Sequence, residues 1–134
     1  MIQGEIFLDS LYTIKGITSD DSRNKLMISI QLNPSHEIFK GHFPVNPILP
    51  GVCIVQILKE ILMCHLDNRL SLCYSSSIKY LSFIDPRVIS TINIDMDLNQ
   101  VATDKICCNA SFGFELVVFC RFKGEFIIKQ KSNQ

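Results

Sequence analysis

One long and almost wholly apolar helical segment limits what this chain can fold into. Residues 51–67 read GVCIVQILKEILMCHLD, where Pro50 and Gly51 mark the expected start of a helix and Asn68 a plausible stop. Apolar side chains point in nearly every direction around this helix, so most of its sides must be covered. In a chain of 134 residues, only a curved sheet can supply that cover. The sequence therefore predicts an α+β fold in which a curved antiparallel β-sheet wraps one long central helix.

The rest of the chain supplies strand-like segments for such a sheet. These segments are rich in β-branched and aromatic residues or alternate apolar with polar residues. The expected strands are residues 5–15, 25–33, 72–84, 88–98, 104–114 and 116–129. Turns are expected at residues 18–24, at Asp85-Pro86, at Asn99-Gln100 and near Gly113. The length fits one domain, residues 1–134.

Composition narrows the class of function. The chain has 13 Lys+Arg and 13 Asp+Glu, and this balance argues against a protein built to bind nucleic acid. Its 6 cysteines form no CxxC pair and no zinc spacing, so we expect reduced thiols and no metal site. The first residues lack the pattern of a signal peptide, and the longest apolar run contains Lys59 and Glu60, which argues against a membrane span. A cytoplasmic protein is the expectation.

The segment before the helix carries the first candidate site residues. Residues 41–51 read GHFPVNPILPG and place His42 in a loop stiffened by prolines. His42 is the best candidate for proton transfer because its intrinsic pKa is near neutrality. Gly51 opens the helix, where free N–H groups and the dipole attract an anion or a polarised carbonyl. The alternatives are a histidine bonded to the backbone and a glycine selected for turn geometry.

Two polar residues within the apolar helix form the second candidate group. Gln56 and Glu60 are one turn apart on the same helix face, and polar groups on a buried helix need a partner or a function. A structural pair between Lys59 and a carboxylate is the alternative for Glu60. For His36 and His65 we expect structural or solvated roles.

Residues 37–58, EIFKGHFPVNPILPGVCIVQIL, resemble the β-hydroxyacyl-acyl carrier protein dehydratases of the hotdog fold (FabZ/FabA-like). The shared elements are GHFP, the PI-x-PGV segment and the helix that follows. Residues 78–88, IKYLSFIDPRV, resemble the next strand of that family. The resemblance covers roughly residues 25–98. The usual N-terminal HRxPF-type segment is not visible, and Ile89-Ser90-Thr91 replaces the usual PGD turn.

The resemblance implies a dehydratase of fatty acid or related polyene and lipid synthesis. His42 would remove the proton α to the thioester carbonyl, and the Gly51 amide would bind that carbonyl. The site would lie at the interface of a homodimer or of a heterodimer with another hotdog subunit, whose sheets join edge to edge. No cofactor is implied beyond the phosphopantetheine of acyl carrier protein, which carries the substrate. A basic rim would receive this carrier, and its candidates are Lys40, Lys79, Arg87, Arg121 and Lys123.

The chain departs from the family at the acidic position, which falls on Gln56. An amide orients a hydroxyl but cannot act as a general acid. Three hypotheses follow. Glu60 substitutes for the acid from one turn away; or the chain donates His42 to a site completed by the carboxylate of a heterodimeric partner; or the chain is no dehydratase, but a non-catalytic acyl binder or a thioesterase.

Overall fold

The computed structural model describes residues 10–20, 24–40 and 48–129, and of residues 72–76 it describes the backbone alone. The described part of the chain contains one α-helix, one short 3₁₀ helix and six strands. The elements are β1 (Tyr12–Ser19), β2 (Lys25–Leu32), η1 (Glu37–Phe39), α1 (Gly51–Leu66), β3 (Arg69–Tyr80), β4 (Thr91–Ala102), β5 (Lys105–Phe114) and β6 (Val117–Lys129).

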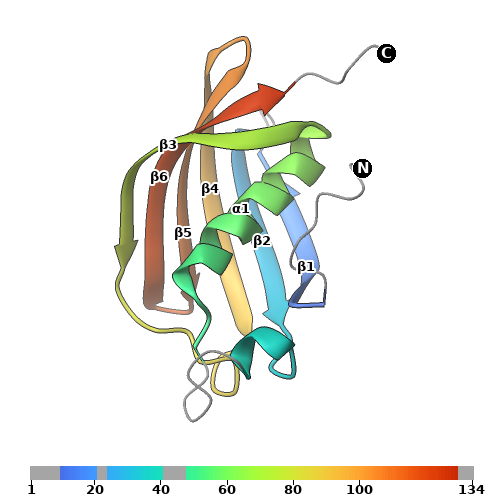
Figure 1. The fold of residues 1–134 in the computed structure, drawn as a ribbon, viewed down its shortest axis with the longest axis vertical. Coiled ribbons are helices and arrows are strands. Elements are labelled where there is room, and N and C mark those ends of the chain that lie inside the picture. Colours follow the sequence, from blue (N-terminus) through green and yellow to red (C-terminus); the bar gives the residue numbers. More distant parts are fainter. Residues whose placement is uncertain (1–9, 21–23, 41–47, 130–134) are drawn as a thin grey trace.

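The six strands form one antiparallel sheet in the order β1-β2-β4-β5-β6-β3. The sheet curls around α1, which lies along its concave face (Figure 1). The two edge strands, β1 and β3, therefore flank opposite sides of the helix. This arrangement confirms the predicted α+β fold with a central helix inside a curved sheet.

Alternating burial along the strands explains how the sheet covers the helix. β2 and β4 bury every second side chain, as expected for strands with one face on a core and one in water. The inward side chains meet the side of α1 that carries Ile57, Leu58 and Ile61, each 0% exposed. The side of α1 away from the sheet is less covered, and Val52 there is 76% exposed.

The ends of α1 follow the sequence closely. Pro50 precedes the helix in an extended conformation, and its fixed φ suits a helix start. The helix ends at Leu66, one residue before the predicted end, because Asp67 adopts a left-handed conformation with φ 51°. The Asp67 N–H then donates to the Met63 carbonyl and closes the last turn.

Three predicted strands are wrong in their bounds. The strand predicted at residues 5–15 continues instead to Ser19, since Thr18 and Ser19 pair with β2; residues 5–9 lie outside the described residues. The strand predicted at residues 72–84 is β3, which begins at Arg69 and ends at Tyr80. The strand predicted at residues 88–98 is β4, which begins at Thr91 and ends at Ala102.

The turn predicted at Asn99-Gln100 is also wrong. Both residues pair with β5, and the chain turns at residues 103–104 instead. Polar residues at exposed positions do not end a strand when the neighbouring strand still pairs with its backbone.

Candidate active site

The first part of the candidate site is a pocket at the start of α1. Its volume is about 270 Å³, and it lies between the helix start, the end of β3 and the loop after β3. Its lining is mostly apolar and consists of Ile48, Leu49, Pro50, Gly51, Ile54, Tyr80, Ser82, Phe83 and Ile84. The Leu49 N–H donates to the Ile84 carbonyl at 2.9 Å, which ties the segment before the helix to the loop after β3. The pocket is thus built by segments that are far apart in the sequence.

Gly51 lies directly beneath the ring of Tyr80. A Cβ at position 51 would lie 2.7 Å from both the Cζ and the hydroxyl oxygen of Tyr80, which is closer than real Cβ contacts allow. The ring of Tyr80 can therefore pack on the helix start only because residue 51 is glycine. This packing gives the glycine a structural reason, and it also leaves the backbone open to a ligand on the pocket side.

The helix start offers hydrogen-bond donors without a competing side chain. Pro50, at the N-cap position, makes no side-chain cap bond, and the first turn contains no acidic residue. The partial positive charge of the helix terminus thus faces the pocket without a carboxylate of its own first turn. Burial raises the pKa of Tyr80, so its hydroxyl stays protonated at neutral pH and can donate as well.

The second part of the candidate site is a polar cluster on the side of α1 that faces β1. Glu60 is only 1% exposed, and it is the one charged residue that is buried within the described ranges. The Tyr12 hydroxyl donates to Glu60 Oε1 at 2.8 Å. The Gln56 Nε2 amide donates to Glu60 Oε2 at 3.0 Å. Two donors from two different elements thus compensate for the burial of this carboxylate.

The negative charge of Glu60 also affects the pKa values of neighbouring side chains. Burial, and then the hydrogen bond and charge of Glu60, raise the pKa of Tyr12 far above its ordinary value of 10.0. Burial and the charge of Glu60 also raise the pKa values of Cys53 and Cys64. At neutral pH, Tyr12 is therefore a hydrogen-bond donor and the two thiols are neutral.

The two parts of the candidate site lie on opposite sides of the helix. At about 100° per residue, Glu60 is about 180° around the axis from Gly51 and about 13.5 Å further along it. The contacts agree, because Gly51 meets Tyr80 of β3 whereas Glu60 meets Tyr12 of β1, at the other edge of the sheet. The structure brings Gln56 and Glu60 together, but it does not bring Gly51 to them.

The remaining predicted site residues are placed as follows. His42 lies outside the described residues, so its role stays a prediction. His36 has a structural role, since its Nδ1 accepts from the Ile38 N–H at 3.0 Å and caps η1. His65 lies in the last turn of α1. Of the expected basic rim, Arg87 forms an ion pair with Asp85 at 3.0 Å.

Sequence reasoning missed two tyrosines. Tyr12 and Tyr80 are the residues that join α1 to the two edge strands through Glu60 and Gly51. A strand tyrosine with a partly buried ring needs a hydrogen-bond partner for its hydroxyl. This need was the one sign in the sequence that the two tyrosines contact polar or close-packed groups. It does not say which polar group across the fold is that partner.

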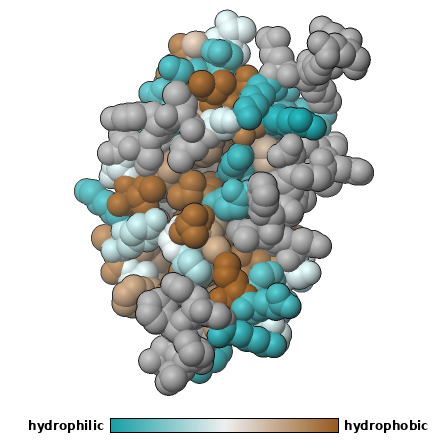
Figure 2. Space-filling model, viewed as in Figure 1, coloured by the Kyte–Doolittle hydropathy of each residue, from teal (hydrophilic) through white to brown (hydrophobic). Residues whose placement is uncertain are grey.

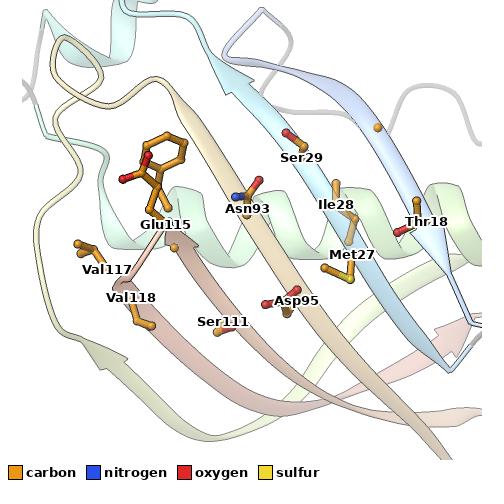
Figure 3. A pocket seen from close by; sticks show the side chains of 13 residues that line it. Thr18, Met27, Ile28, Ser29, Asn93, Asp95, Ser111, Glu115, Val117 and Val118 are labelled. Atoms are coloured by element: carbon orange, nitrogen blue, oxygen red, sulfur yellow. The ribbon is translucent and has the colours of Figure 1, made fainter.

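A larger hollow, of about 460 Å³, lies on the outer face of the sheet, away from α1 (Figure 3). Its polar side chains come from strand positions that face solvent, such as Asn93, Asp95 and Ser111. None of its polar side chains is buried. We therefore place the candidate site at α1, not here.

Apolar surface surrounds the helix start. Val52, Tyr80, Leu81 and Phe83 are each more than half exposed, and we call them the pocket rim. Figure 2 shows that hydrophobic side chains reach the surface on the face where α1 lies in front of the sheet. Exposed apolar surface of this kind around a pocket is typical of an interaction site.

Three further findings apply to the described residues alone. The cysteines whose side chains are described are free, namely Cys53, Cys64, Cys107, Cys108 and Cys120. No group of three or more potential metal ligands occurs in the described ranges. Over those same residues, no helix is long and apolar enough to cross a membrane.

Comparison with known protein families and sequences gives a consistent picture. A model of the ApeI-like family, described as ApeI dehydratase, matches residues 18–111. The 3-hydroxyacyl-[acyl-carrier-protein] dehydratase FabZ of Lactobacillus helveticus is 28% identical over 106 residues, which are 70% of this chain and 67% of that protein. The FabZ of Lactococcus lactis is 41% identical over 39 residues, which are 29% of this chain and 26% of that protein.

Solved structures share the fold at low sequence identity. The dehydratase heterocomplex ApeI:P from Xenorhabdus doucetiae superimposes with a TM-score of 0.68 and 18% identity, over 86% of this chain and 96% of that one. A hypothetical thioesterase with coenzyme A from Streptococcus pneumoniae TIGR4 gives a TM-score of 0.62 and 12% identity, over 90% of this chain and 88% of that one. These likenesses confirm the predicted hotdog fold.

Proposed function

Because this chain belongs to the ApeI-like dehydratase family, we propose that it contributes one half of a 3-hydroxyacyl thioester dehydratase site that a second subunit completes. The reaction removes the proton at the α carbon and the hydroxyl at the β carbon, and it gives a 2-enoyl thioester and water. The chain supplies the base, His42, and the carbonyl-binding amide, Gly51. The second subunit supplies the group that assists the departing hydroxyl.

One observation carries this proposal: Gly51 and the Gln56–Glu60 pair face opposite edges of the sheet. A thioester bound at Gly51 cannot reach the polar pair of the same chain, because the helix stands between them. Two chains related by symmetry can combine the Gly51 pocket of one with the Gln56 side of the other.

The pocket at the helix start suits a thioester. Its apolar lining fits the first carbons of an acyl chain. The first-turn N–H groups of α1 beside this pocket are the donors that would stabilise a carbonyl oxygen as it gains negative charge. His42 precedes this pocket by only a few residues of chain, in the GHFP segment. An enolate that forms when His42 takes the α proton is thus stabilised by donors that need no rearrangement.

The position of the acid shapes the second half of the proposal. In a homodimer the departing hydroxyl meets Gln56, which accepts or donates a hydrogen bond but does not protonate. General acid–base assistance contributes typically about 10²–10⁴-fold to a rate. A homodimer is then a slow dehydratase, and a heterodimer whose partner carries a carboxylate is a fast one. One structural relative is the dehydratase heterocomplex ApeI:P from Xenorhabdus doucetiae.

The expected interface has the features of a contact surface. β3 is an edge strand of 12 residues, and no strand of the described residues pairs with its outer side. The pocket rim continues from the end of this strand, with Phe83 77% exposed. Joining two such edges extends the sheet and covers the rim in the same step. The substrate arrives on the phosphopantetheine arm of acyl carrier protein.

An assay of the reverse reaction tests the proposal. Purified chain is incubated with a crotonyl thioester of pantetheine, and hydration is followed by the loss of enoyl absorbance. We expect slow hydration by the chain alone, none by His42→Asn and an unchanged rate for the matched variant His65→Gln. Hydration that survives in His42→Asn at the wild-type rate rejects the proposed base.

The same assay separates two alternatives. A thioesterase releases free thiol, which a thiol reagent detects; the fold of the coenzyme A-bound thioesterase favours this candidate. A thioesterase also needs a carboxylate that activates water, and Gln56 does not supply one. A non-catalytic subunit shows neither activity alone and raises the activity of the partner with which it co-purifies.

A further inference from the structure

Glu60 is an unusual residue for the interior of this protein. Its carboxylate is 1% exposed, although burying a charge is very unfavourable unless donors replace the lost water. The donors are the Tyr12 hydroxyl on Oε1 and the Gln56 amide on Oε2, at 2.8 and 3.0 Å. Each carboxylate oxygen thus accepts from a different element of the fold. The Glu60 carboxylate, fixed by hydrogen bonds on both oxygens, is suited to fix the orientation of a side chain that donates to it.

The residue that Glu60 holds is Gln56. A glutamine amide has a donor end and an acceptor end, and an ionised carboxylate accepts only. Gln56 must therefore turn its nitrogen toward Glu60, as it does, and direct its carbonyl oxygen elsewhere. Gln56 is half-buried, so part of this residue reaches the surface.

Tyr12 is the other support of the carboxylate. It lies in β1, 48 residues away in sequence from Glu60, and its hydroxyl fixes the side of Glu60 that Gln56 does not reach. The two thiols on the same side of the helix, Cys53 and Cys64, are neutral and supply no competing charge. The orientation of the Gln56 amide thus depends on Glu60, and the position of Glu60 depends on Tyr12.

We infer that Tyr12 is a positioning residue: by donating to Glu60 it fixes the carboxylate that keeps the Gln56 carbonyl oxygen turned outward as a hydrogen-bond acceptor. This inference deepens the proposed function, on which its last step rests. An outward acceptor selects a ligand group that donates a hydrogen bond, and the β-hydroxyl of a 3-hydroxyacyl thioester is such a group. Glu60 then acts through Gln56 and does not itself touch the substrate.

The first test follows the Gln56 amide directly by ¹H–¹⁵N NMR of the full chain, with the side-chain signal assigned by its loss in Gln56→Glu. We expect this signal to move in Tyr12→Phe, which removes only the hydroxyl, and in Glu60→Gln, which removes the charge. Glu125→Gln is the matched control, because Glu125 pairs with Lys105 at 3.7 Å on the surface. A Gln56 signal that stays at its wild-type position in Tyr12→Phe overturns the inference, whether or not the protein is an active dehydratase.

The second test is kinetic and concerns the role in the reaction. In Tyr12→Phe we expect kcat for crotonyl thioester hydration to fall roughly 10-fold with KM nearly unchanged, as expected when an orienting hydrogen bond is lost. A purely structural tyrosine lowers the amount of folded protein but not the kcat of the folded fraction, and that result contradicts the inference. Inactive wild-type protein counts against the proposed function only, since the amide signal still reports on Tyr12.

A third variant covers the case in which Tyr12→Phe does not fold. The double variant Tyr12→Phe/Glu60→Gln removes the hydroxyl and the charge together, so no carboxylate is left short of a donor. We expect it to fold and to show the displaced Gln56 signal. A double variant with the wild-type Gln56 signal overturns the inference.

Discussion

The start and the middle of α1 each contact a tyrosine of an edge strand, but the two contacts have opposite surroundings. At the start, Tyr80 lies over Gly51 beside an apolar pocket, and the rim of that pocket is exposed. In the middle, Tyr12 lies against Glu60, where a charge is sealed inside the protein. Tyr80 thus lines an open pocket, whereas Tyr12 donates to a carboxylate that is closed off from solvent. The difference agrees with the proposal that the helix start receives a ligand, whereas the middle of the helix sets the orientation of Gln56.

Substitution at the helix start gives the largest expected effect. Gly51→Val places a side chain where Tyr80 now lies, so the ring must move and the side chain fills the pocket. Valine retains the backbone N–H, but its side chain keeps the thioester carbonyl away from that donor. Loss of an oxyanion contact typically lowers kcat by about 10²–10³-fold, and we expect a loss of this order in the hydration assay. The double variant Gly51→Val/Tyr80→Ala removes the clash. If it regains full activity, the glycine serves packing alone and the comparison between the two regions fails.

The sealed cluster predicts a loss of stability instead. Glu60→Leu leaves the hydroxyl of the half-buried Tyr12 without its acceptor, and we expect the free energy of unfolding in urea to fall by about 2 kcal/mol. Tyr12→Phe/Glu60→Leu leaves neither partner and should recover most of that loss. Additive losses in the double variant would mean that the two side chains do not act as a pair.

The exposed rim predicts a smaller effect on association. Phe83→Ser removes an aromatic side chain that is 77% exposed in this chain. If a second subunit buries this ring, the dissociation constant of the dimer should rise by roughly 30-fold, which corresponds to about 2 kcal/mol for a buried aromatic side chain. Leu116→Ser is the matched control, because Leu116 is 100% exposed at the turn between β5 and β6. Sedimentation of both variants checks this, and equal shifts in the two remove the rim from the interface.

The smallest effect concerns the thiol of Cys64. Burial and the charge of Glu60 raise the pKa of Cys64, so less thiolate is present at a given pH than for an ordinary cysteine. Glu60→Gln removes the charge and should lower this pKa, because a nearby negative charge disfavours the thiolate. We expect alkylation of Cys64 at pH 8 to become severalfold faster in Glu60→Gln, measured by mass spectrometry. An unchanged rate would mean that burial alone sets the pKa.

Sequence reasoning reached the architecture through one segment. An apolar helix over residues 51–67 in a short chain requires a surrounding sheet, and the helix is found at Gly51–Leu66 inside that sheet. Strand bounds were harder to predict, since pairing with β2 extends β1 through the polar residues Thr18 and Ser19. A strand end depends on its neighbour, which local composition does not reveal.

The candidate site was predicted only in part. That Gln56 and Glu60 share one helix face was predicted from their spacing of one turn, but their hydrogen bond at 3.0 Å was not predicted. Tyr12 and Tyr80 were not predicted, because their partners lie far away in sequence and depend on how the sheet curls. That Gly51 and Glu60 face opposite edges follows from helix geometry, but which strands those edges are required the fold.

The hydration rate after exchange of the polar pair, Gln56 and Glu60, is the most direct test of the proposed half-site. The double variant Gln56→Glu/Glu60→Gln keeps one amide and one carboxylate at the two positions and moves the carboxylate to position 56, which we propose faces the site shared with the second subunit. We expect its homodimer to hydrate a crotonyl thioester faster than the wild-type homodimer, by up to roughly 10²–10⁴-fold. A wild-type homodimer that is already fast, together with an exchanged variant that is no faster, would contradict the claim that this chain needs a carboxylate from elsewhere.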